Sequence, residues 1–93
     1  MNSDSIEIGS YVLSKKGRDC QEISIVYNII DNDYVLLVDG KGKTLQKPKR
    51  KNKKHLKNLG VVNCKIADKI KTGKKIFDAE IYSAISKAEF DNK

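Results

Sequence analysis

The chain has 93 residues, of which 39% are hydrophobic and 33% are charged. This length suits one small domain and leaves no room for a large active-site cleft between two lobes, which disfavours an elaborate enzyme. Nineteen Lys and Arg residues against twelve Asp and Glu residues give a net charge of +7 at pH 7, a balance that indicates a polyanionic partner.

The N-terminal half has the residue pattern of β-strands. Isoleucines alternate with polar residues at positions 6–8, apolar residues occupy positions 11–13, and the polar cluster 14–19 marks a turn. Residues 22–31 alternate with a period of two, and residues 34–39 are apolar on both faces. The short polar loop between these two segments favours an antiparallel hairpin. We expect strands near residues 8–14, 22–31, 34–39, 43–46 and 54–59.

The C-terminal third has the pattern of two amphipathic helices. Apolar residues recur every four positions from Val62 to Ile70, and Gly73 is typical of a helix end. Apolar residues mark one face of the next segment, for which Asp78 is the expected N-cap. We expect helices near residues 63–72 and 78–89.

The strand near residues 34–39 needs cover on both faces, which a flat sheet in so short a chain cannot provide. A sheet curled into a small barrel covers one face, and the two predicted helices can cover the other. We therefore predict a mainly β fold, in which a small barrel is followed by two short C-terminal α-helices within one domain.

The positive charge is concentrated in one segment, residues 41–57, which we call the basic run. The whole chain carries +7 and this segment carries +9 with no acidic residue, so the rest of the chain carries −2. From position 46 to 55 the only apolar residue is Pro48, so this part must lie at the surface. Gly40, Gly42 and Pro48 disfavour a continuous helix, and we expect an extended basic loop or an edge strand. The basic residues of the run are Lys41, Lys43, Lys47, Lys49, Arg50, Lys51, Lys53, Lys54 and Lys57.

Such unmixed positive charge is typical of polyanion binding, and the alternative is a solvated loop that only keeps the protein soluble. Lysines outnumber the single arginine of the run eight to one, which favours contacts to a phosphate backbone over base recognition. No aromatic residue lies between Val35 and Ile76, so the run lacks the stacking surface of single-strand binders, and structured RNA is the expected ligand. We interpret Tyr11, Tyr27 and Tyr34 as barrel residues, because they lie within the apolar alternation.

Three segments resemble, in their order, a KOW motif: residues 8–19 (IGSYVLSKKGRD), 23–31 and 34–40. The basic continuation, residues 47–56, is similar to that of bacterial KOW-domain RNA-binding proteins related to the archaeal and eukaryotic large-subunit ribosomal protein of the fourteen-e type. The resemblance covers about residues 6 to 60, roughly two thirds of the chain.

The resemblance implies an SH3-like KOW barrel in residues 1–60, with a helical extension, residues 61–93, packed on it. It also implies a cytoplasmic, ribosome-associated protein that acts in translation. Its expected partners are RNA, above all ribosomal RNA of the large subunit, and ribosomal proteins.

In the family, Gly17 would occupy the glycine turn of the motif, and its basic neighbours would lie on the RNA-facing loop. The basic stretch that ends in His55 and Leu56 would correspond to the basic stretch of the ribosomal relatives. The predicted RNA-binding residues are Lys15, Lys16, Gly17, Arg18, Lys41, Lys43, Lys47, Lys49, Arg50, Lys51, Lys53, Lys54, His55 and Lys57.

We predict no catalytic residue, no metal and no cofactor. His55 is the only histidine, and no nucleophile–base arrangement can be singled out around it. Cys20 and Cys64 lack the companions of a zinc site, so we interpret them as reduced thiols of a cytoplasmic protein. We find neither the pattern of a signal peptide nor a stretch near about 18 apolar residues, so no membrane segment is expected.

Two alternative functions stay open. An SH3-like barrel can also serve as a protein-interaction module in translation or transcription complexes. A polybasic protein on a membrane surface is less favoured, because the run lacks interleaved bulky apolar residues and a lipid-anchor signal. In each case we expect a monomer when the protein is free.

Overall fold

The computed structural model describes residues 6–15 and 22–88. Strands occupy the first part of these ranges and helices the second. The elements are β1 (Ser10–Ser14), β2 (Ile23–Ile29), β3 (Tyr34–Val38), β4 (Lys49–Asn52), the 3-10 turn η1 (Lys53–His55), β5 (Leu56–Val62), α1 (Cys64–Thr72) and α2 (Asp78–Lys87).

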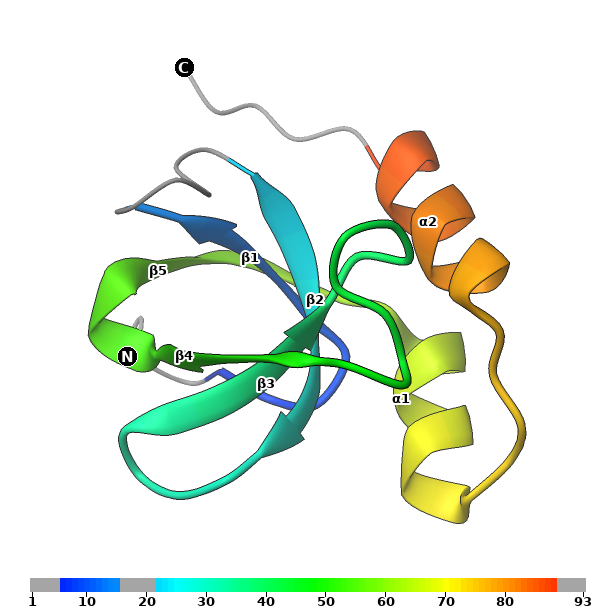
Figure 1. Ribbon diagram of the computed structural model, residues 1–93, viewed down its shortest axis with the longest axis horizontal. Coiled ribbons are helices and arrows are strands. Elements are labelled where there is room, and N and C mark those ends of the chain that lie inside the picture. The colour runs from blue at the N-terminus through cyan, green and yellow to red at the C-terminus, as the bar shows by residue number, and fades with distance from the viewer. Residues whose placement is uncertain (1–5, 16–21, 89–93) are drawn as a thin grey trace.

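The five strands form one antiparallel sheet in the order β4-β3-β2-β1-β5. β4 and β5 are therefore the two edges of the sheet, yet the three residues of η1 join them directly. So short a connection between the two edges requires the sheet to curl, and Figure 1 shows the resulting barrel-like shape with both helices on one side. The mainly β fold with two C-terminal helices is confirmed.

Two clusters of buried side chains cover the two faces of the sheet. Inside the curl lie Ile6, Val12, Val26, Val35, Leu37 and Leu56. On the outer face, Tyr11, Ile25 and Val38 pack against Ile66 of α1 and Ile81 of α2. Neighbouring residues such as Leu37 and Val38 enter different clusters, because successive side chains of a strand point to opposite faces. This arrangement explains why the third strand is apolar on both faces.

Two glycines allow the helices to lie close to the barrel. Gly9 has a φ of +89°, and a Cβ atom there would lie 2.6 Å from the Cβ of Ala67 in α1. Gly40 has a φ of +79°, and a Cβ atom there would lie 2.3 Å from the carbonyl oxygen of Asp78 in α2. A side chain at either position would combine a strained backbone with a steric clash, so both positions require glycine.

The sequence-based strand at residues 43–46 is wrong, because residues 39–48 form a loop and the fourth strand lies at Lys49–Asn52. This strand contains no apolar residue, but it pairs with β3 through backbone hydrogen bonds at the edge of the sheet. It is the edge strand that the basic run offered as an alternative to a loop. Edge pairing needs no buried side chain, so an apolar pattern could not fix its bounds. The strand expected at residues 54–59 begins two residues later, after η1, and continues to Val62.

Asp78 is not the N-cap of α2, as the sequence had suggested, but its first helical residue; Phe77 is the N-cap. The Asp78 carboxylate instead accepts a hydrogen bond of 2.8 Å from the backbone N–H of Leu45, in the loop that precedes β4. At the start of α2, the carboxylate of Glu80 accepts a hydrogen bond from the backbone N–H of Phe77, so Glu80 and not Asp78 stabilises this helix end. The C-terminal end of α1 is as predicted, with Gly73 in the left-handed conformation.

Candidate nucleic-acid interface

Six of the basic residues lie along a continuous path of β4, η1 and the start of β5. The backbone of this path is anchored at the 3-10 turn. The Asn52 side-chain oxygen accepts the N–H of Lys54 at 2.9 Å, and the N–H of Lys53 donates to the carbonyl oxygen of Asp33 at 2.8 Å. The path therefore connects the edge of the sheet with the tip of the β2–β3 hairpin. Its basic residues are Lys49, Arg50, Lys51, Lys53, Lys54 and Lys57.

The end of β1 joins the same surface. The backbone N–H of Lys15 donates to the carbonyl oxygen of His55 at 2.8 Å, so the last residue described before the gap lies beside η1. Lys15 belongs to the predicted KOW loop and His55 to the basic run, and the two segments are far apart in the sequence. Within the described residues, the fold thus brings Lys15, from one of the two groups that sequence analysis connected with RNA, beside the other group.

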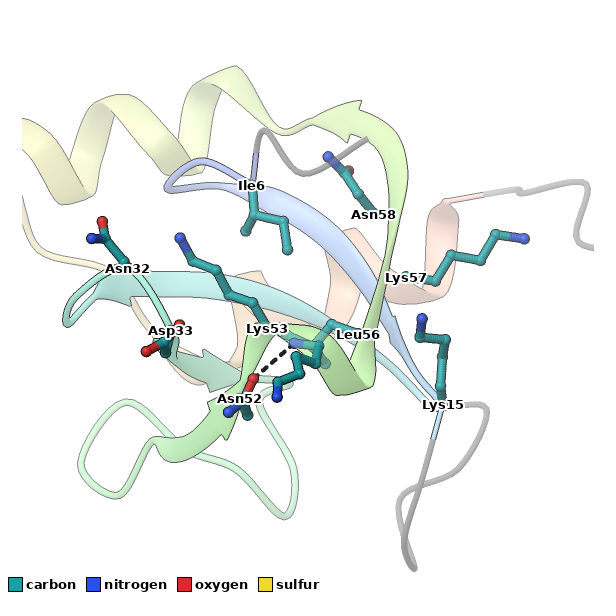
Figure 2. A pocket seen from close by; sticks show the side chains of 10 residues that line it. Ile6, Lys15, Asn32, Asp33, Asn52, Lys53, Leu56, Lys57 and Asn58 are labelled. Carbon is teal, nitrogen blue, oxygen red and sulfur yellow. Dashed lines mark hydrogen bonds between the residues drawn. The ribbon is translucent and has the colours of Figure 1, made fainter. Parts of the chain in front are cut away.

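These segments surround a hollow of about 660 Å³ at one end of the barrel, shown in Figure 2. Four lysines and a single aspartate line it, so its lining carries a formal charge of +3. We call it the end hollow. Its lining residues are Ile6, Lys15, Asn32, Asp33, Asn52, Lys53, Lys54, Leu56, Lys57 and Asn58.

The hairpin beside the end hollow is ordered by a carboxylate. The side chain of Asp31 accepts the backbone N–H groups of Asp33 at 2.8 Å and of Tyr34 at 2.9 Å. These hydrogen bonds lower the pKa of Asp31, and the nearby positive charges of Arg50 and Lys53 act in the same direction. Arg50 also lies 4.7 Å from the ring centroid of Tyr34. The charged form of Asp31 therefore holds the hairpin tip in place.

Lys43 differs from the other members of the basic run. Only 6% of it is exposed, and its ammonium group lies 3.2 Å from a carboxylate oxygen of Glu22 and 3.4 Å from one of Asp39. Burial raises the pKa of Asp39, but hydrogen bonds from the backbone N–H groups of Lys43 and Lys41, together with the Lys43 charge, outweigh this effect and lower it. Its charge is therefore engaged within the protein, which disfavours the RNA contact predicted for Lys43; that contact stays a prediction.

The remaining predicted residues lie apart from the end hollow or outside the described ranges. The ammonium group of Lys41 is 5.8 Å from the ring centroid of Tyr82 on α2. Lys47 is exposed in the loop before β4, and the side chain of His55 is half-buried in η1. Lys16, Gly17 and Arg18 lie outside the described residues, as does Cys20.

Sequence analysis missed the polar and apolar residues of the end hollow. Asn32 comes from the β2–β3 hairpin, Asn52 from the end of β4 and Asn58 from within β5, and nothing in their local sequence marks them as members of one site. Ile6 and Leu56, which also line the hollow, were identifiable only as core residues.

The described residues contain no group of three or more His, Cys, Asp or Glu side chains that could hold a metal ion. Within the same part of the chain, no helix has the length and apolar character needed to cross a membrane. Cys64 is an exposed free thiol.

No protein-family model matches the chain, and no curated protein shows a significant match. The resemblance to KOW-domain proteins therefore stays a prediction.

Proposed function

We propose that this protein is an RNA-binding protein of the KOW type that contacts the phosphate backbone of structured RNA. The expected target is ribosomal RNA of the large subunit, bound in the cytoplasm by a ribosome-associated protein without catalytic activity. The single observation that supports this most is the convergence of Lys15 with Lys53, Lys54 and Lys57 around one hollow at the end of the barrel.

A simpler explanation accounts for only part of the charge. Lysines on an edge strand prevent the edge from pairing with another chain, and this could explain Lys49 and Lys51 in β4. It does not explain Lys53, Lys54 and Lys57, which follow the edge and surround the hollow. Among the described residues these three lysines form no salt bridge to a carboxylate, whereas Lys43 forms two. Positive charges that are gathered but not neutralised favour an anionic ligand.

The proposed mechanism is electrostatic. Ammonium groups that contact phosphates release condensed counterions, so each contact contributes roughly −0.7 to −0.9 to the slope of log affinity against log salt concentration. Lysine presents a compact charge without the rigid two-pronged geometry of arginine, so such contacts follow the shape of the RNA more than its sequence.

The test is a variant in which Lys49, Arg50, Lys51, Lys53 and Lys54 are replaced by glutamine. These residues are on the surface path and outside both hydrophobic clusters, so we expect an unchanged circular dichroism spectrum. Each exposed ion contact is worth up to about 1 kcal/mol, so affinity for ribosomal RNA in low salt should fall by about 100-fold or more.

The matched control removes the same charge from the helical extension by replacing Lys65, Lys71, Lys74, Lys75 and Lys87 by glutamine. All five are exposed. The control variant should keep most of its affinity, because its substitutions lie away from the end hollow. Equal losses in both variants would mean that only net charge matters, and unchanged binding in the first variant would contradict the assigned surface.

A protein-interaction module is the second candidate, favoured by aromatic residues at the surface of the helical extension. Phe77 is 55% exposed and Tyr82 is 47% exposed. Exposed aromatic residues are common anchors of protein interfaces. This function predicts a ribosomal or transcription partner that stays bound after nuclease treatment and that is lost in a Tyr82→Ser variant.

A further inference from the structure

The end hollow offers more than a cationic surface. Its lining joins lysine ammonium groups with three asparagine amides and with the apolar side chains of Ile6 and Leu56. Its volume of about 660 Å³ lies within the roughly 300–1,000 Å³ of pockets that hold small organic ligands. A phosphate group alone could use the lysines and the asparagine amides, but it would leave the apolar side chains without a contact.

The two sides of the end hollow differ in charge. Figure 2 shows Lys15, Lys57 and Asn58 on the side of β1 and β5, and Asn32, Asp33 and the end of the Lys53 side chain on the opposite side, at the hairpin. The carboxylate of Asp33 repels phosphate, but it can accept a hydrogen bond from the amino group of a base. The side of β1 and β5 thus carries two cations and no carboxylate, which suits a phosphate, whereas on the hairpin side the Asp33 carboxylate offsets the charge of Lys53.

The walls of the hollow are held by hydrogen bonds in the free protein. The N–H of Lys53 donates to the carbonyl oxygen of Asp33 at 2.8 Å and joins η1 to the hairpin. The side-chain oxygens of Asn52 and Asn58 accept the backbone N–H groups of Lys54 and Gly60, each at 2.9 Å. Because these groups are positioned in advance, a ligand would lose little conformational entropy in ordering them.

A fully paired RNA helix cannot reach such a site with its bases, because the bases are stacked inside the helix and only the backbone and groove edges are accessible. An unpaired nucleotide brings a phosphate and a free base together. We propose that the end hollow binds one unpaired nucleotide of a structured RNA, bulged or terminal, with its phosphate at Lys15 and Lys57 and its base between the apolar floor and Asn32. This proposal rests on the proposed function and adds the class of nucleotide that the RNA must present.

The test compares three RNA stems of the same sequence in low salt: one fully paired, one with a single bulged nucleotide, and one in which the bulge is abasic. The abasic stem keeps the charge and the flexibility of the bulge but lacks the base. Measured by fluorescence anisotropy, the bulged stem should bind about tenfold more tightly than either of the others, at the lower end of what a paired base edge contributes.

Equal affinity for the bulged and the abasic stem would overturn the nucleotide site and leave the proposed function standing. Absence of binding to all three stems would instead contradict the proposed function itself. The two failures are therefore distinguishable in one experiment.

A double variant, Asn32→Ala with Asn58→Ala, tests the residues of the hollow without changing the net charge. It should lose the tenfold preference for the bulged stem and keep its affinity for the paired stem. The matched control is Asn28→Ala, at an exposed asparagine of β2 that does not line the hollow. A full preference in the double variant, with its fold verified by circular dichroism, would overturn the proposal.

Discussion

Both ends of the basic run carry lysines and no carboxylate, but the fold gives them different surroundings. Lys43 is buried beside two carboxylates, one of which, Glu22, comes from the residue before β2. Lys53 and Lys54 line an open hollow and form no salt bridge among the described residues. The difference shows that a run of positive charge indicates a partner for the segment as a whole. Whether one lysine is available depends on carboxylates that the fold brings to it.

The largest expected effect is a loss of RNA affinity when the lysines at the end hollow are replaced. Replacing Lys53, Lys54 and Lys57 by glutamine should lower the affinity for structured RNA by about 30- to 100-fold in low salt, at up to about 1 kcal/mol for each contact. The salt slope should become less steep by roughly 2 to 3, because three phosphate contacts are lost. A salt titration of RNA binding measures both quantities.

The control for this variant is Lys41→Gln, at the other end of the run. Lys41 lies over the ring of Tyr82 and away from the end hollow, so its replacement should change affinity by less than about twofold. If the salt slope changed by the same amount per lysine in both variants, the two ends of the basic run would not differ in RNA binding.

The second-largest expected effect is on stability: a variant at Lys43 should lose stability and keep its RNA affinity. Lys43→Met keeps the length of the side chain and removes the charge that faces Asp39 and Glu22. Breaking a fully buried pair costs about 3–5 kcal/mol, but Glu22 is largely exposed, so we expect a loss of about 2 kcal/mol in the free energy of unfolding. Urea denaturation measures this loss, and RNA affinity of the folded variant should stay within about twofold. A stable variant with weakened RNA binding would place Lys43 in the interface after all.

The third effect concerns the loop that separates the two ends. Asp78→Ala removes the acceptor of the Leu45 N–H, and one such hydrogen bond contributes about 1 kcal/mol to stability. We expect a loss of that size in thermal or urea unfolding, with the barrel and its RNA affinity retained. Glu80, at the same helix end, still accepts the N–H of Phe77 and keeps the start of α2 in place. No change in stability would show that the loop does not depend on this contact.

The smallest expected effect is the pH dependence of the buried lysine cluster. The pKa of Asp39 is lowered in the folded protein, so the unfolded state binds more protons in acid. The stabilisation from Asp39 is therefore complete above its unfolded pKa, near 3.8, and is lost as the pH falls through the folded pKa. Unfolding free energies measured between pH 6 and pH 3 should decrease more for the wild type than for Lys43→Met. Parallel curves would contradict a role for Lys43 in lowering this pKa.

Part of the fold was visible in local patterns, and part was not. The period of two in β2 and the apolar faces of β3 predicted the hairpin, because alternating side chains enter two different cores. β4 was anticipated only as one of two alternatives, an edge strand or an extended loop in the basic run, because an edge strand of basic residues has backbone pairing but no apolar face that would fix its bounds. Asp78 was misassigned for a similar reason: its carboxylate satisfies a loop N–H from a distant segment instead of its own helix.

In the candidate site, too, some residues could be identified from the sequence and others could not. The basic run and Lys15 were identified from residue type and from the KOW resemblance. Asn32, Asn58 and the place of Leu56 in the lining were not, because they become a site only when the hairpin, η1 and β5 meet at one end of the barrel.

By itself, the sequence determined a small mainly β domain with two helices and one dense segment of positive charge. These properties follow from composition and from the periodicity of apolar residues, which can be recognised within short segments of the chain. Only the tertiary structure decided which lysines are neutralised, which strand closes the sheet and where a hollow forms. Those outcomes depend on contacts between distant segments, such as Lys43 with Glu22 and Lys15 with His55, whose geometry no local pattern specifies.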